Sequence, residues 1–191
     1  MSDVVNIVAI SRVTLSGSHD SLPQLLGLSR HRLRVKRPYI PKLKTKRSMN
    51  QFSGYFMRLE NGTVTVFESG KVVSNGLKHW SDMVTVNDQF ASYLMVHLPQ
   101  DVDFDLELPK IVNATGCRNL EKRIDLRKFS NSDPQASYEP EIFPNLQYTF
   151  IDGERVRGIV SKNGKIIVTG VKDSNKMNLF LDKLQEKIES M

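Results

Sequence analysis

The sequence predicts an α+β fold in which two pseudo-symmetric repeats share one antiparallel sheet, with helices covering one face. Three observations carry this prediction. Gly70-Lys71-Val72-Val73 recurs as Gly164-Lys165-Ile166-Ile167, an offset of 165 − 71 = 94 that also pairs Gly76 with Gly170. Strand and helix patterns follow the same order in both halves. A chain of 191 residues can bury one good core, which the two repeats would share.

The first repeat, expected over residues 1–98, opens with a strand and a short helix. Val4–Val13 carries β-branched and apolar residues at adjacent positions, which predicts a strand buried on both faces. Ser21 with Pro23 shortly after it is a helix-start signal, so a short helix is expected over residues 22–33.

A three-strand meander and a longer helix complete this repeat. Asn61-Gly62 is a strong hairpin signal between strands expected over residues 52–59 and 63–67, and a third strand is expected over residues 71–76. Ser81 is the expected N-cap of the helix. Its apolar stripe recurs at steps of three or four residues and comprises Met83, Val86, Phe90, Leu94 and His97.

The second repeat, expected over residues 99–191, follows the same order after a solvated link over residues 99–105. Its strands are expected over residues 108–117, 143–151, 156–160 and 165–170, with a short helix near residues 123–129. Ser174 is the expected cap of the last helix. The apolar stripe of that helix comprises Met177, Leu181, Leu184 and Ile188.

Helices on one side of this sheet leave its other face uncovered. Strands such as Lys165–Val171 have apolar residues at adjacent positions, so both of their faces are apolar. An uncovered apolar face beside basic residues is typical of a binding surface. The minor groove of DNA fits such a face, and so does another protein chain.

Positive charge is concentrated in one segment, although the formal net charge is only +6. No Asp or Glu occurs between Ser21 and Leu59. The ten basic residues there are Arg30, Arg32, Arg34, Lys36, Arg37, Lys42, Lys44, Lys46, Arg47 and Arg58. Charge of one sign in one segment is typical of phosphate contact. A solvated loop or a nuclear-import signal explains the same residues, and these alternatives stay open.

Several function classes lack their motifs. The sequence has no Gly-rich phosphate loop and no Gly-x-Ser-x-Gly elbow. Cys117 is the only cysteine, and His19, His31, His79 and His97 lack metal-ligand spacing. No apolar run approaches the ~20 residues of a membrane-spanning helix. We therefore expect a soluble, intracellular protein that is not an enzyme and needs no metal or cofactor.

The stretch Tyr138–Lys172 carries a family resemblance. Its run Tyr-Glu-Pro-Glu-Ile-Phe-Pro, then a hairpin, then Gly-Lys-Ile-Ile-Val-Thr-Gly, resembles the second repeat of the TATA-box-binding proteins. The resemblance is strong from Arg123 onward, moderate over residues 52–78 and poor over residues 14–51, where a basic insertion occupies about residues 30–47. It implies a saddle: a curved antiparallel ten-strand sheet with four helices on its convex face.

The resemblance also implies that the concave face binds the minor groove. The implied residues are Asn6, Val8, Val73 and Asn75 in the first repeat, and Asn113, Thr115, Ile167 and Thr169 in the second. The amides of Asn6 and Asn113 suit A·T pairs, which present only acceptors in the minor groove. Thr169 matches a threonine of the family pattern, whereas Asn75 replaces it.

Phenylalanines that wedge between base steps and kink the duplex are a known feature of this family. The matching residues are Phe52 and Phe67, named here the first-repeat wedge pair, and Phe143 in the second repeat. The fourth wedge position falls on Val160 or Ser161. Ordinary core packing is the alternative for each phenylalanine. The implied phosphate-binding residues are Arg58, Lys71, Lys78, Lys165 and Lys172.

The function implied is a DNA-binding factor for transcription initiation that grips and bends A/T-rich promoter DNA. Glu139 and Glu141 match the family's loop that contacts transcription factor IIB, so a factor-IIB-like protein is an expected partner. A factor-IIA-like protein and the RNA polymerase machinery are further expected partners, in the nucleus or wherever transcription takes place. The alternative is an adaptor that keeps the saddle but works through protein partners, with weak or no DNA binding. The absent fourth wedge and Asn75 favour this alternative.

Overall fold

The computed structural model describes residues 3–18, 20–27, 54–151 and 155–190, and its elements fall into two similar sets. The first set is β1 (Asp3–Ser16), α1 (Leu22–Leu25), β2 (Gly54–Leu59), β3 (Gly62–Phe67), β4 (Lys71–Leu77) and α2 (Asp82–His97). The second set is β5 (Asp103–Leu106), β6 (Lys110–Asn119), α3 (Leu126–Ser132), β7 (Ala136–Ser137), β8 (Leu146–Thr149), β9 (Arg157–Val160), β10 (Lys165–Val171) and α4 (Ser174–Glu189).

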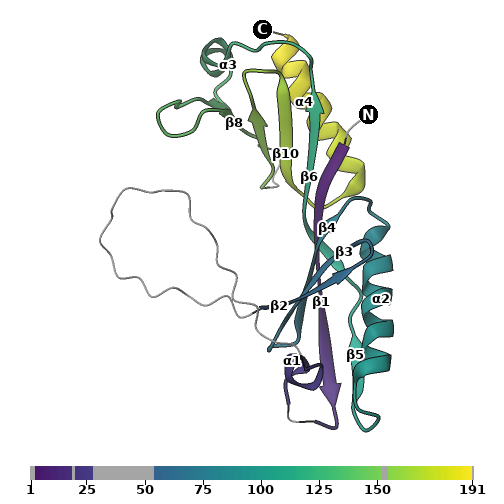
Figure 1. The fold of residues 1–191 in the computed structure, drawn as a ribbon. Helices are drawn as coiled ribbons and strands as arrows, with labels where there is room; N and C mark the ends of the chain where they lie inside the picture. Colours follow the sequence, from purple (N-terminus) through teal and green to yellow (C-terminus); the bar gives the residue numbers. More distant parts are fainter. Residues whose placement is uncertain (1–2, 19, 28–53, 152–154, 191) are drawn as a thin grey trace, which may run out of the picture.

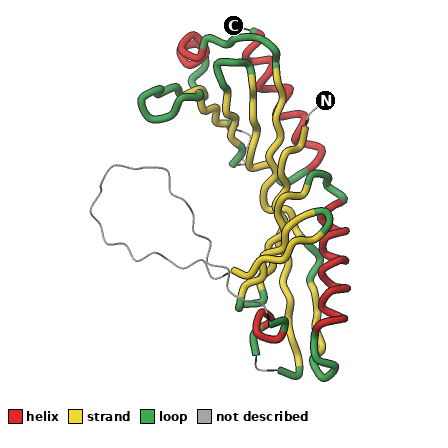
Figure 2. Tube along the Cα trace, in the orientation of Figure 1, coloured by secondary structure: helices red, strands yellow, loops and turns green. Residues whose placement is uncertain are grey.

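The strands form one ten-stranded antiparallel sheet in the order β2-β3-β4-β1-β6-β10-β9-β8-β7, with β5 paired to β1 outside this path. β1 and β6 lie side by side at its centre, where Ile7 pairs with Ala114. The long helices α2 and α4 lie on the same side of the curved sheet, one over each half (Figures 1 and 2). This arrangement confirms the predicted α+β saddle. The division of the repeats between residues 98 and 99 stays a prediction.

Both long helices bury the apolar stripes that hold them on the sheet. In α4 the predicted residues Met177, Leu181, Leu184 and Ile188 are all buried, as are Val86, Phe90 and Leu94 in α2. Burial of side chains of this size contributes roughly 1.5–3 kcal/mol each. The prediction that His97 belongs to the stripe is wrong, because this residue is exposed and its ring stacks on Tyr93 of the same helix at 3.9 Å.

The helix caps differ from the prediction at both long helices. Ser81 makes no side-chain cap; instead the carboxylate of Asp82 accepts hydrogen bonds from the N–H groups of Lys78 and His79, at 3.0 and 2.8 Å. It also accepts one from the Asn61 amide at 3.1 Å, which ties the β2–β3 turn to α2. Burial raises the pKa of Asp82, but these hydrogen bonds outweigh it and hold the pKa below its usual range. In α4 the cap is Asp173.

Three segments differ from their predicted structure. The expected helix over residues 22–33 is the single turn α1, and residues 28–33 lie outside the described part of the chain. The end of the expected solvated link forms most of β5, whose residues pair with the end of β1 from Val13 to Ser16. The strand expected over residues 143–151 begins only at Leu146, so Phe143 lies in the loop before it. The short strand β7 was not predicted.

Candidate nucleic-acid interface

The sheet face opposite the long helices carries a continuous row of half-buried side chains. A Cβ on Gly116 of β6 would lie 2.6 Å from the sulfur of Met177 in α4, so Gly116 faces that helix. Neighbouring strand residues point to opposite faces, and Thr115 therefore points to the concave face. Strand pairing and burial place on this face all the residues predicted for the minor groove: Asn6, Val8, Val73, Asn75, Asn113, Thr115, Ile167 and Thr169.

Two asparagines lie close together at the centre of this face, on β1 and β6. Asn6 pairs with Thr115, and Asn113 pairs with Val8 across the same two strands. Val8 and Thr115 each stand two residues after an asparagine, so the pairing is reciprocal. The two amides therefore lie on either side of the pseudo-twofold axis that relates the repeats.

Each asparagine holds its carboxamide in one orientation. The Oδ1 atom of Asn6 accepts a hydrogen bond from the N–H of Gly76 at 2.9 Å, and Oδ1 of Asn113 accepts one from the N–H of Gly170 at 2.8 Å. A backbone N–H can only donate, so the oxygen must face it and the NH₂ group must point away. Gly76 and Gly170 have φ angles of +79° and +93°, which favour glycine in both turns.

A hydroxyl network extends the site in the second repeat. The Oγ1 atom of Thr169 lies 3.0 Å from Oγ1 of Thr115 and donates to Oδ1 of Asn113 at 3.3 Å. The first repeat has Asn75 and Val8 at the equivalent positions, so it cannot form the same network. Asn75 is half-buried and, within the described residues, its side chain makes no hydrogen bond. Among the described residues of the concave face, the first repeat thus presents one more free amide than the second.

The predicted wedge residues that the structure describes are both half-buried. Phe67 is the last residue of β3 and pairs with Gly54 of β2. Phe143 lies in the loop between β7 and β8, where its N–H donates to the carbonyl of Glu139 at 2.9 Å. Phe52 and the basic segment at residues 30–47 lie outside the described residues.

The position equivalent to Phe67 in the second repeat is Ser161. The N–H of Gly70 donates to the carbonyl of Phe67 at 3.0 Å, and the N–H of Gly164 donates to the carbonyl of Ser161 at the same distance. Val160, the other candidate, is fully buried in β9. A hydroxymethyl group therefore occupies the place of the fourth phenyl ring.

The side chains predicted to bind phosphate are all exposed, and they are Arg58, Lys71, Lys78, Lys165 and Lys172. Lys71 and Lys165 are the first residues of β4 and β10, and the other two lysines directly follow these strands. The Lys78 ammonium donates to the carbonyl of Val5 at 2.7 Å, which holds its charge beside β1. The lysine charges therefore flank the row of asparagines and threonines and do not interrupt it.

Glu139 and Glu141 are exposed on the loop between β7 and β8, which projects from one end of the sheet (Figure 1). The carbonyl of Glu139 accepts hydrogen bonds from the N–H groups of Ile142 and Phe143, at 3.0 and 2.9 Å, so the loop turns tightly. Ile142 is 80% exposed beside the two acids. Sequence analysis missed this residue, although a large apolar side chain in a loop is a signal of protein contact.

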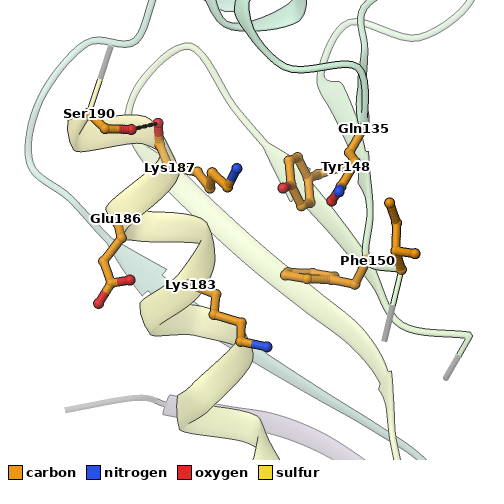
Figure 3. A pocket seen from close by; sticks show the side chains of 8 residues that line it. Gln135, Tyr148, Phe150, Lys183, Glu186, Lys187 and Ser190 are labelled. Atoms are coloured by element: carbon orange, nitrogen blue, oxygen red, sulfur yellow. Dashed lines mark hydrogen bonds between the residues drawn. The ribbon is translucent and has the colours of Figure 1, made fainter. Parts of the chain in front are cut away.

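A separate hollow lies beside α4 in the second repeat. Figure 3 shows Lys187 of α4 on one side of it and Tyr148 of β8 on the other. Both contact Asp133, whose carboxylate lies 3.1 Å from the Lys187 ammonium and accepts from the Tyr148 hydroxyl at 3.4 Å. Burial raises the pKa of Asp133, but hydrogen bonds from Gln135 and Lys187 outweigh it and lower the pKa. These polar groups are hydrogen-bonded to one another, which indicates that they connect α4 to β8 and have a structural role.

Other kinds of site can be assessed over the same part of the chain. Among the residues that the structure describes, no three His, Cys, Asp or Glu side chains lie close enough to hold a metal ion. None of the helices described is both long and apolar enough to cross a membrane. Asp82 and Asp133 are the described carboxyl groups with shifted pKa values. Asp82 accepts hydrogen bonds at the start of α2, and Asp133 contacts Lys187 of α4, so both have structural roles.

Comparison with known proteins decides the family. A TATA-box-binding protein of Pyrobaculum aerophilum is 31% identical over 144 residues, which cover 74% of this chain and 71% of the relative. The chain belongs to the TATA-box-binding protein family. A TATA-box-binding protein of Aeropyrum pernix is 32% identical over 143 residues, covering 73% of this chain and 68% of the relative. The family model for transcription factor TFIID, or TATA-binding protein, matches residues 108–191.

The fold is also that of a solved TATA-binding protein. The Methanococcus jannaschii TBP superposes with a TM-score of 0.71 at 24% identity, covering 100% of this chain and 99% of that structure. Within this TATA-box-binding protein fold, the concave face is wider than the sequence motifs indicated. Ile10 of β1 and Ile159 of β9 are also half-buried on it. Their alternation with buried residues was the signal that could have found them.

Proposed function

We propose that this protein is a transcription-initiation factor that binds the minor groove of A/T-rich promoter DNA with its concave face. The observation that carries this proposal is the orientation of the two central amides. Oδ1 of Asn6 and Oδ1 of Asn113 accept from the N–H groups of Gly76 and Gly170, so both NH₂ groups point away from these backbone groups and, in this proposal, toward the DNA. Relatives of the same family that bear the name TATA-box-binding protein support it.

The amides match the chemistry of A·T pairs. In the minor groove A·T and T·A pairs offer adenine N3 and thymine O2, which are acceptors only, so an NH₂ group can donate to either. A G·C pair adds the guanine N2 amine, a donor that would meet the amide NH₂ directly. Two amides at the centre of the face would therefore exclude G·C pairs from the middle of the site. Val8, Val73 and Ile167 beside them supply apolar contact to the sugars.

The proposed bending of DNA rests on the phenylalanines that match the family's wedge residues. Phe67 and Phe143, with Phe52, are proposed to enter base steps and open the groove against the curved sheet. Ser161 is too short to hold a base step open. We therefore expect the second repeat to kink DNA less than the first. Lys71, Lys165 and the basic segment at residues 30–47 would then hold the phosphates along the bent duplex.

The loop between β7 and β8 is the proposed docking point for a factor-IIB-like protein. Glu139 and Glu141 are exposed there, and the exposed Ile142 adds an apolar contact beside them. A small apolar centre within charged residues is the usual arrangement of a protein interface. A factor-IIA-like protein and the polymerase machinery would assemble on the same complex, at the site of transcription, which is the nucleus in a cell that has one.

One observation favours a second candidate function. Ser161 removes the fourth wedge, so the bent duplex would touch less of the concave face, and the protein could act as an adaptor with weak DNA binding. Fluorescence anisotropy with A/T-rich and G/C-rich duplexes, each at several salt concentrations, separates the two. The promoter-factor proposal requires a preference for the A/T-rich duplex of at least about tenfold, or about 1.4 kcal/mol. Equal, weak binding to both duplexes would favour the adaptor.

A further inference from the structure

An arginine and a threonine have exchanged strands between the two repeats. In the first repeat Arg58 of β2 pairs with Thr63 of β3. In the second repeat Thr149 of β8 pairs with Arg157 of β9. Each hairpin therefore carries one arginine and one threonine at this pair, with the charge on the outer strand in the first repeat and on the inner strand in the second.

Strand pairing shows that the two positions are equivalent. Thr63 pairs with Asn75 of β4, and Arg157 pairs with Thr169 of β10. Asn75 and Thr169 match each other at the same offset as the repeated Gly-Lys motifs, because 169 − 75 = 94. The offset between Thr63 and Arg157 is also 157 − 63 = 94. Arg157 is thus the second-repeat counterpart of Thr63.

Arg157 points to the concave face. Its neighbour Gly158 faces α4, because a Cβ there would lie 2.8 Å from the side chain of Leu184. Residues next to each other in a strand point to opposite faces, and directly paired residues share a face. Arg157 therefore stands beside Thr169 on the side of the central amides. It is exposed, and it has no ion-pair partner among the residues that the structure describes.

We propose that Arg157 is a DNA-backbone contact of the second repeat, which takes the place that Arg58 has in the first. This inference rests on the proposed function, since the concave face must hold DNA. Adjacent strands are about 4.8 Å apart, so Arg157 places its charge one strand nearer to the central amides than Arg58 does. A guanidinium binds phosphate oxygens with two parallel N–H groups. In the proposed complex Thr169 contacts the floor of the minor groove, and Arg157 beside it faces the sugar-phosphate wall of the same groove.

The test compares the salt dependence of DNA binding for Arg157→Gln and for Arg127→Gln. Arg127 is exposed on α3, so its replacement removes the same charge at a site that the proposal keeps away from DNA. For the parent and both variants, log K for one A/T-rich and one G/C-rich duplex is measured against log salt. Losing one phosphate contact lowers the magnitude of the slope by roughly 0.9. We expect that change for Arg157→Gln, an unchanged slope for Arg127→Gln, and an unchanged A/T preference for both.

A double variant tests the exchange itself. Arg157→Thr with Thr149→Arg moves the charge to the outer strand, as in the first repeat, and should restore the parent slope. Equal slopes for Arg157→Gln and Arg127→Gln would overturn the proposal. If the double variant has the same reduced slope as Arg157→Gln, the charge on the outer strand does not replace the charge on the inner strand, and the proposed exchange is wrong. Absence of an A/T preference in the parent would instead refute the proposed function, so the two failures are distinguishable.

Discussion

Replacing Asn113 by Asp changes one atom on the concave face and keeps the internal contacts of this side chain. Oδ1 still accepts from the N–H of Gly170, at 2.8 Å in the parent, and from the hydroxyl of Thr169, at 3.3 Å. A carboxylate accepts such bonds more strongly than an amide does. The fold should therefore be retained. The outward NH₂ group becomes a negatively charged oxygen, which can only accept.

The expected loss of affinity follows from the groups that would face this oxygen. A good pair of hydrogen bonds to a base edge contributes about 1–3 kcal/mol of discrimination, and the donor is lost. The new carboxylate would also face acceptor lone pairs without a donor, and an unsatisfied charged group costs about as much again. We expect a loss of about 3 kcal/mol, which is on the order of 100-fold in Kd.

The matched control is Asn178→Asp. Asn178 is exposed on α4, so this variant introduces the same charge by the same atomic change on the helix side of the sheet. Fluorescence anisotropy on an A/T-rich duplex should show less than about a threefold effect for the control, because distant charges are screened. Thermal unfolding should give similar midpoints for both variants. If Asn113→Asp binds DNA as tightly as the control, the amide does not contact the bases.

Three further predictions concern bending, partner binding and stability. Alanine at both residues of the first-repeat wedge pair should remove most of the DNA bend, whereas Phe143→Ala should remove less, measured with paired dyes; equal losses would contradict the asymmetry. Lysine at both Glu139 and Glu141 should abolish a ternary complex with a factor-IIB-like protein in a gel shift but preserve binary DNA affinity; loss of both would make the loop structural. Asp82→Ala should lower the free energy of unfolding by about 1–2 kcal/mol. The pKa of Asp82 is lower in the folded state than its unfolded value near 3.9, so the ionised carboxylate stabilises the fold above that pH. In urea unfolding, the free energy of unfolding of the parent should therefore fall as the pH drops below about 4. Asp82→Asn should show a smaller fall over the same pH range.

The fold could be predicted where one local pattern dominates. The stripe from Met177 to Ile188 repeats at helical spacing and is buried as expected, and Asn61-Gly62 marks the β2–β3 hairpin. Segments set by tertiary pairing were missed. The acids of Asp103–Leu106 predicted a solvated link, yet this segment forms β5 against the end of β1. Its alternation of acidic and apolar residues was a strand signal that the charge concealed.

The candidate site shows the same division. The family resemblance implied Asn6 and Asn113, but the direction of their amides depends on Gly76 and Gly170, which lie far away in the sequence. Sequence also left the fourth wedge position open by one residue, because the loop lengths differ between the repeats. The backbone hydrogen bond from Gly164 to Ser161 identifies the equivalent position.

The central claim is that the concave face reads the minor groove of A·T pairs, and inosine tests it most directly. An inosine·cytosine pair lacks the guanine N2 amine, so its minor groove resembles that of A·T while its major groove keeps the pattern of G·C. Binding is measured for three duplexes that differ only in the central base pairs: A·T, inosine·cytosine and guanine·cytosine. The account predicts similar affinities for the first two and binding at least about tenfold weaker for the third. Inosine·cytosine binding as weak as guanine·cytosine would contradict it.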